Sequence, residues 1–147
     1  MFEEIVNYTE AADKKIISIF ESAIASMPEA ERLFSHVLNA QHVWIERILG
    51  NVPLYGIWET HPKARFKIIS VNNFEGIRSI LASRALDEQI AYQNSVGKQF
   101  QNTVGEILFQ LLNHSTYHRA QIATLFKREG LTPPVTDYIM FKRNHLL

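Results

Sequence analysis

Apolar residues recur every three or four positions over much of the chain, a spacing typical of helices with one buried face. In residues 2–24 this stripe runs from Phe2 to Ala23 and predicts a first amphipathic helix. The charged residues of the segment fall largely off the stripe; they include Glu3, Glu10, Asp13 and Lys14. Residues 26–29, Ser-Met-Pro-Glu, resemble a capping box and predict a second helix that ends at Gly50. The short gap between the two helices predicts antiparallel neighbours.

Residues 51–71 interrupt the helical pattern with two prolines and a glycine. A connection of this length in a small domain is usually functional or wraps the core. Residues 72–75, Asn-Asn-Phe-Glu, also resemble a capping box and predict a third helix that reaches about Ser83.

Residues 84–102 contain two short segments around Asn-Ser-Val-Gly that could form a small hairpin. Residues 103–106, Thr-Val-Gly-Glu, form another capping-box pattern and predict a fourth helix that extends to Glu129, where a glycine follows. The tail from Leu131 onward is expected to fold back on the helices. We therefore predict one all-α domain over residues 1–147, a four-helix bundle with a long connection between helices two and three.

Composition and charge narrow the classes of function. Hydrophobic residues make up 46% of the chain and charged residues 20%, which is ordinary for a globular protein. There are 15 basic and 15 acidic residues, so the formal net charge is zero. A protein that binds nucleic acid through phosphate contacts would carry a basic surface, and we therefore expect no nucleic-acid partner.

The chain has no cysteine, which excludes disulfides, thiolate metal sites and a cysteine nucleophile. A metal site would have to use nitrogen and oxygen ligands. No basic segment followed by an apolar run opens the chain, and no apolar stretch approaches the roughly 20 residues that span a bilayer. The pattern predicts a cytoplasmic protein without a membrane partner.

The candidate chemistry is concentrated in the fourth predicted helix, where His114 and His118 lie four residues apart. That spacing places both rings on one helix face, the geometry with which two imidazoles can bind one metal ion. The surrounding stripe predicts that the face points inward; its apolar members are Ile107, Leu111, Ile122 and Leu125. Buried imidazoles need compensation, by a metal or by ordinary hydrogen bonds within the core. Ser115 and Thr116 occupy the middle of the motif, so the glutamate of a zinc protease of the H-E-x-x-H type is absent and the pair does not indicate a protease.

A metal site of this kind normally takes a third protein ligand. The second predicted helix offers His36 and His42, and periodicity does not choose between them because both lie near the edges of a broad apolar arc. His61 and His145 lie in less regular segments and are expected to be surface histidines.

Three segments resemble a known family. Residues 112–121, Leu-Asn-His-Ser-Thr-Tyr-His-Arg-Ala-Gln, are very close to the NHxxxHRGQ signature of the DinB/YfiT-like superfamily, with Ala120 in place of the usual glycine. Residues 36–47 are similar to the HxxxxxxxW helix of that superfamily, and residues 133–138 resemble its C-terminal segment. The resemblance covers nearly the whole chain. Its members are four-helix-bundle metalloenzymes that include bacillithiol and mycothiol S-transferases.

The resemblance implies a three-histidine site of His36, His114 and His118. In the family's pattern the ligand lies eight residues before the tryptophan, a position that His36 holds relative to Trp44; His42 remains the rival. Family members hold a divalent metal there, most often zinc or nickel, and many are homodimers.

From these features we derive a leading hypothesis and two alternatives. A metal held by three neutral imidazoles would lower the pKa of a thiol, and a chain without cysteine must take its sulfur from a low-molecular-weight thiol. The leading hypothesis is a metal-dependent S-transferase in detoxification or stress response. One alternative is a non-catalytic metal-binding homodimer or sensor. The other is a metal-assisted hydrolase, ranked lowest because the motif contains no glutamate.

Residues around the ligands complete the prediction, although none is assigned a catalytic role. Asn39, Asn113 and Gln121, or a backbone carbonyl, are candidates to accept the second N–H of a metal-binding histidine. Arg119 could meet the carboxylate of an anionic thiol, or it could be a solvated residue or pair with a neighbouring helix. The two tryptophans are expected to be packing residues, with the alternative that one lines a substrate pocket.

Overall fold

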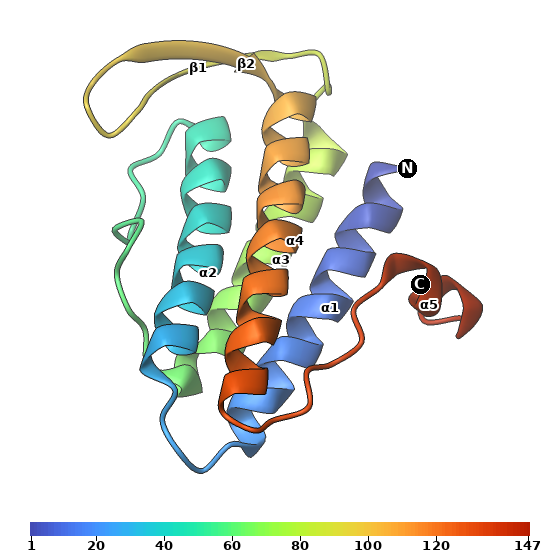
Figure 1. The fold of residues 1–147 in the computed structure, drawn as a ribbon. Coiled ribbons are helices and arrows are strands. Elements are labelled where there is room, and N and C mark those ends of the chain that lie inside the picture. Colours follow the sequence, from blue (N-terminus) through green and yellow to red (C-terminus); the bar gives the residue numbers. More distant parts are fainter.

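The computed structural model describes residues 1–147 and is mostly helical, with five α-helices and one two-stranded sheet (Figure 1). The elements are, in order, α1 (Phe2–Ser22), α2 (Pro28–Leu49), a 3₁₀ turn (Lys63–Arg65), α3 (Phe66–Ser83), β1 (Gln89–Gln93), β2 (Gln99–Thr103), α4 (Val104–Arg128) and α5 (Tyr138–Arg143). The four long helices lie alongside one another, and the hairpin crosses one end of them. The chain is thus mostly helical, as the predicted all-α class requires, with one small sheet added to the helices.

The first two helices run in opposite directions, as predicted, but they are not the closest neighbours. Helix α1 packs mainly against α3 and α4, and α2 packs mainly against α4 and α3. Because α2 and α3 run in the same direction, the segment between them must return along the length of α2 (Figure 1). This parallel arrangement explains why the connection is long.

Helix α2 starts at Pro28, as predicted, but without the predicted capping box, and the predicted start of α3 is corrected. The N-cap of α2 is Met27, which makes no side-chain cap, and its backbone N–H donates to the carboxylate of Glu31 at 2.8 Å. Helix α3 starts at Phe66, well before the predicted position at Asn72. Asn73 lies inside α3, and its amide donates to the carbonyl of Leu38 at 3.0 Å, so it connects two helices instead of capping one.

The predicted hairpin is confirmed. Strands β1 and β2 pair antiparallel, with Gln89 opposite Thr103, and Gly97 in the turn adopts a φ of 79°. Thr103 then caps α4: its hydroxyl accepts from the backbone N–H of Glu106 at 3.1 Å, while the Glu106 carboxylate accepts from the backbone N–H of Thr103 at 2.9 Å. The predicted capping box is therefore present at this helix.

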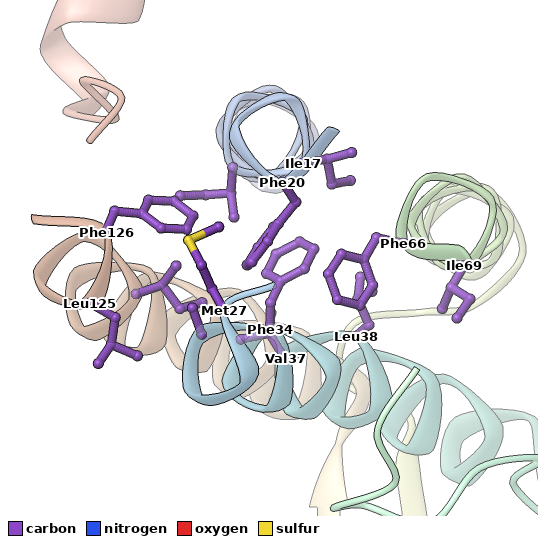
Figure 2. Packing of buried hydrophobic residues seen from close by; sticks show 13 residues of the cluster. Ile17, Phe20, Met27, Phe34, Val37, Leu38, Phe66, Ile69, Leu125 and Phe126 are labelled. Atoms are coloured by element: carbon purple, nitrogen blue, oxygen red, sulfur yellow. The ribbon is translucent and has the colours of Figure 1, made fainter. Parts of the chain in front are cut away.

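The apolar core consists of two clusters. Figure 2 shows the first, in which aromatic rings from all four long helices meet; its rings are Phe20, Phe34, Phe66 and Phe126. The Phe20 ring lies 5.1 Å from the rings of Phe66 and Phe126, both edge to face. The second cluster lies toward the hairpin and is mainly aliphatic; its members include Ile45, Phe74, Ile77, Leu108 and Leu112.

A buried polar layer lies between the two clusters and takes one residue from each long helix, namely Asp13, Gln41, Asn73 and Ser115. The Gln41 amide donates to the Asp13 carboxylate at 2.8 Å and to the Ser115 hydroxyl at 3.1 Å. Arg119 pairs with Asp13 at 3.1 Å. Asp13, predicted to lie off the buried face, is fully buried because this layer supplies its partners. Every buried side-chain nitrogen and oxygen has a hydrogen-bond partner.

The C-terminal tail folds back on the helices, as predicted. Phe141 of α5 is buried, and its ring lies 5.6 Å from that of Tyr8 on α1. The Tyr8 hydroxyl donates to the carbonyl of Thr136 at 2.7 Å. Among the helices, none has the length and apolar character that crossing a membrane requires.

Candidate metal centre

Three histidines converge between α2 and α4. His36 of α2 and His114 and His118 of α4 each offer one ring nitrogen, and these three atoms lie within 4.8 Å of one another. The Nε2 atom of His114 lies 3.2 Å from Nε2 of His36 and 3.0 Å from Nε2 of His118. We call these residues the histidine cluster.

The other histidines lie elsewhere. His42 accepts a hydrogen bond at its Nε2 from the backbone N–H of Leu54 at 2.9 Å, which directs its ring toward the long connection. His61, expected at the surface, is buried; its Nε2 lies 2.6 Å from Oδ1 of Asn39. His145 is exposed near the C-terminus. Of the two rivals on α2, the structure brings His36 and not His42 to the pair on α4.

The histidine pair lies at the edge of the buried face of α4, where the apolar stripe predicted an inward direction. His114 and His118 are partly exposed, whereas Ser115 and Arg119 are buried. The buried positions of α4 are here one residue later than predicted, because Ser115 and Arg119 are the side chains that enter the polar layer and contact its members. The histidines are thereby displaced toward solvent.

Hydrogen bonds fix how two rings of the cluster are protonated. Nδ1 of His36 lies 3.0 Å from the carbonyl oxygen of Ile57, and Nδ1 of His118 lies 2.6 Å from Oε1 of Gln121. Both partners are acceptors, so both Nδ1 atoms carry a proton and both Nε2 atoms present a lone pair. His114 can donate only one proton to these two lone pairs. An excess of lone pairs at one point is what a metal cation would satisfy, and the cluster therefore fits a metal ion.

Burial keeps the rings in the form that binds metal. Desolvation, followed by the charges of His118 and His36, lowers the pKa of His114 to about 4. Desolvation also lowers the pKa of His36, although its bond to the Ile57 carbonyl opposes the shift. Both rings are neutral at pH 7, as a metal ligand must be.

The polar residues proposed to surround the ligands take different positions. Gln121 contacts His118 directly, whereas Asn39 donates to the carbonyl of Glu59 at 2.7 Å and so holds the long connection. Asn113 is exposed on α4 and makes no side-chain hydrogen bond. The Arg119 guanidinium bonds Asp13 and, at 2.8 Å, the hydroxyl of Thr116. Its side chain therefore forms contacts inside the protein and pairs with a neighbouring helix, which was one of the alternatives for this residue.

The long connection forms one wall of the cluster. Its Trp58 stacks on His36 with ring centroids 3.7 Å apart and planes inclined by 9°, and 50% of its surface is exposed. Side chains of α2 hold this segment in place; one of them, Ser35, accepts a hydrogen bond from the backbone N–H of His61 at 3.0 Å. Sequence reasoning missed Ser35 and the Ile57 carbonyl, because neither residue type signals a metal site.

A groove with a volume of about 380 Å³ adjoins the cluster between α2 and α4. Its lining includes Gln121, which bonds His118, and Arg32, which lies one helical turn before His36. A larger cavity of about 580 Å³ lies between α1 and α3 and contains no histidine. No histidine lines the smaller groove itself, and Gln121 is the residue that connects its lining to the cluster.

Two comparisons relate the chain to known proteins. The model of the DinB family matches residues 20–145, a range that contains all three histidines of the cluster. Protein DinB of Bacillus subtilis (strain 168) is 24% identical over 150 residues, covering 95% of this chain and 86% of the relative.

Proposed function

The chain belongs to the DinB family, and from this membership and its histidine cluster we propose that it is a divalent-metal-dependent enzyme. The reaction we propose is the transfer of a low-molecular-weight thiol to an electrophile, in detoxification or stress response. The observation that carries the proposal is the convergence of three imidazole nitrogens in a chain without cysteine. The packing of α1 to α4 around a shared core supports the four-helix bundle of this family, as one domain over residues 1–147.

The proposed ligands are His36, His114 and His118, with zinc or nickel as the preferred ions. All three rings are neutral ligands and leave the full charge of the ion uncompensated. When bound, such an ion lowers the pKa of a coordinated thiol. The Ile57 carbonyl and the Gln121 amide hold two of the rings in the required tautomer and orientation.

The proposed reaction joins the sulfur of the thiol to the electrophilic atom of the second substrate. The bond to the leaving group breaks with its electron pair, and the thiol proton passes to solvent. The protein supplies no sulfur of its own, since it has no cysteine. Its residues would position the thiol, and Trp58 shields one side of His36 from water.

Access to the cluster favours catalysis over a purely structural metal or a sensor. His114 and His118 are partly exposed, and a groove large enough for a small molecule adjoins them. Metal-assisted hydrolysis receives less support because no carboxylate belongs to the cluster.

We also propose that the protein forms a homodimer. Phe109 and Tyr117 offer exposed aromatic surface on α4 for such an interface. Light scattering should then give twice the mass of the 17.0 kDa chain.

The first test is the metal content of untagged protein purified without chelator, measured by inductively coupled plasma mass spectrometry. We expect about one zinc or nickel ion per chain in the wild type and in His42→Ala. His36→Ala and His118→Ala should lose the ion, because each removes one of three donors.

His42→Ala is the matched control, since it removes a histidine of the same helix that lies outside the cluster. A wild type that stays metal-free after reloading would overturn the proposed site. Metal-loaded protein that consumes no thiol with any of a panel of electrophiles would overturn the transferase and leave the metal-binding homodimer.

A further inference from the structure

The groove beside the histidine cluster has an unusual electrostatic lining. It runs between the first turns of α2 and the last turns of α4, and its polar lining residues are Glu29, Arg32, Gln121, Thr124 and Arg128. Two guanidinium groups therefore face a single carboxylate. The chain as a whole has no net charge, so this local excess of positive charge does not follow from the overall composition.

Both arginines are exposed, and no carboxylate occupies their N–H groups. Neither Arg32 nor Arg128 forms a salt bridge or a side-chain hydrogen bond, whereas Arg78, Arg84 and Arg119 all pair with carboxylates. The guanidinium of Arg32 lies 4.8 Å from the centroid of the Trp58 ring. An arginine held against an aromatic ring keeps its N–H groups available for a ligand.

Gln121 adds a donor at the end of the groove nearest the cluster. Its Oε1 accepts from Nδ1 of His118, so its amide nitrogen still has protons to donate. The hydroxyl of Thr124 is already used, because it donates to the carbonyl of Ala120 at 3.2 Å. The groove thus presents two guanidinium groups and one amide N–H₂, all of which are donors suited to an anion.

The spacing of these donors relates them to the metal site. Arg32 precedes His36 by one turn, or roughly 6 Å along α2, and Arg128 follows His118 by roughly 15 Å along α4. Side chains on a helix slope toward its N-terminus, which brings the Arg128 guanidinium back toward the cluster. A group bound between the two arginines would lie on the order of 10 Å from the histidine nitrogens.

From this arrangement we infer that the groove is a carboxylate-binding subsite for the thiol substrate, with Arg32 and Arg128 as its recognition residues. The inference rests on the proposed function and specifies its substrate class. The thiol is a small molecule that carries a carboxylate several bonds from its sulfur. The sulfur occupies the histidine cluster while the carboxylate occupies the groove.

The test compares two thiols of equal length on cobalt-loaded protein, 6-mercaptohexanoate and 6-mercaptohexan-1-ol. Coordination of a thiolate to cobalt(II) adds charge-transfer absorption in the near ultraviolet, which gives a dissociation constant for each thiol without turnover. The wild type should bind the carboxylate about tenfold more tightly, a preference that corresponds to one or two charge-assisted hydrogen bonds. High salt should reduce it, because the groove is open to solvent.

Substitutions of the two arginines test whether they cause the preference for the carboxylate thiol. Arg32→Gln and Arg128→Gln should each reduce the ratio of the two affinities several-fold, and the double variant should bring it close to one. Arg32→Lys should retain part of the preference, which separates the loss of charge from any disturbance of Trp58. Arg143→Gln on α5 removes the same charge away from the groove and is the matched control.

The outcomes separate the subsite from the transferase. Equal affinity of the wild type for both thiols would overturn the subsite alone, and so would a preference that Arg143→Gln reduces as much as Arg32→Gln does. If neither thiol changes the cobalt spectrum, thiol binding itself fails, and the proposed function falls together with the subsite.

Discussion

At the scale of single residues, the histidine cluster depends on which nitrogen of each ring carries the proton. The carbonyl of Ile57 and the amide of Gln121 hold the protons of His36 and His118 on Nδ1, away from the point where the Nε2 atoms meet. A metal site that had to reorient its ligands before binding would lose affinity. The contacts around the cluster are therefore as relevant to metal binding as the ligands themselves.

We predict that Gln121→Leu lowers the affinity for zinc by roughly 10- to 100-fold, because His118 loses the acceptor that fixes its tautomer. Competition with a chromophoric chelator measures this affinity. Gln110→Leu, an exposed position on the same helix, should leave it unchanged. Equal zinc affinities for the wild type and Gln121→Leu would show that the Gln121 contact does not stabilise the bound metal.

How far single residues could be predicted differs across the site. The spacing of His114 and His118 indicated a metal pair from the sequence alone, but the choice of His36 over His42 depended on the family resemblance. The stacking of Trp58 and the contact of the Ile57 carbonyl could not be predicted. Both come from an irregular segment whose path is set by contacts with α2 that have no periodic pattern.

At the scale of elements, helix starts show what local patterns can and cannot decide. The pattern at residues 103–106 and the pattern at residues 72–75 look alike in sequence, yet only the first caps a helix. The difference is that Asn73 finds partners on α2, which makes its polar side chain part of the interior. A capping-box pattern is thus ambiguous wherever a buried polar contact is available to the same residue.

The capping box of α4 should make stability depend on pH in a defined direction. The hydrogen bond from the backbone N–H of Thr103, followed by that from Asn102, lowers the pKa of Glu106 below its ordinary value of 4.5. The carboxylate therefore contributes stability above about pH 4.5, and the contribution is lost as the pH falls through the lower, folded-state pKa. We predict that Glu106→Ala melts below the wild type at pH 7 and that the difference shrinks toward pH 3.

Melting temperatures measured by circular dichroism across this range test the prediction. Glu75→Ala changes an exposed glutamate within α3 that has no capping role and serves as the control. A melting difference between the wild type and Glu106→Ala that is the same at pH 7 and pH 3 would contradict the role assigned to the carboxylate.

At the scale of the whole molecule, the polar layer fixes how the four long helices align. Each helix contributes one polar residue, and the layer closes only when all four lie at the same level. A shift of one helix along its axis would leave the Asp13 carboxylate buried without its partners, at a cost of several kcal/mol. The aromatic and aliphatic clusters on either side would tolerate such a shift more easily, since apolar packing is less directional.

Removal of one partner of the buried ion pair should therefore be costly. We predict that Arg119→Met lowers the free energy of unfolding by about 3–5 kcal/mol, because it leaves Asp13 in the interior without its charged partner. The double variant Asp13→Leu/Arg119→Met should recover part of this loss. Urea unfolding followed by circular dichroism measures both variants. If the double variant is no more stable than Arg119→Met, the ion pair is not the source of the effect.

The half-exposed ring of Trp58 should make the fluorescence of this protein sensitive to metal binding. An indole stacked on an imidazole reports changes in that imidazole through its fluorescence, and His36 is the imidazole that a metal would change. The chain has only one other tryptophan, Trp44, which lies beside Tyr92 and Arg47 near the hairpin. In Trp44→Phe, the tryptophan fluorescence of the protein would come from Trp58 alone, which is in contact with the cluster. Metal binding could then be followed in real time without an added dye.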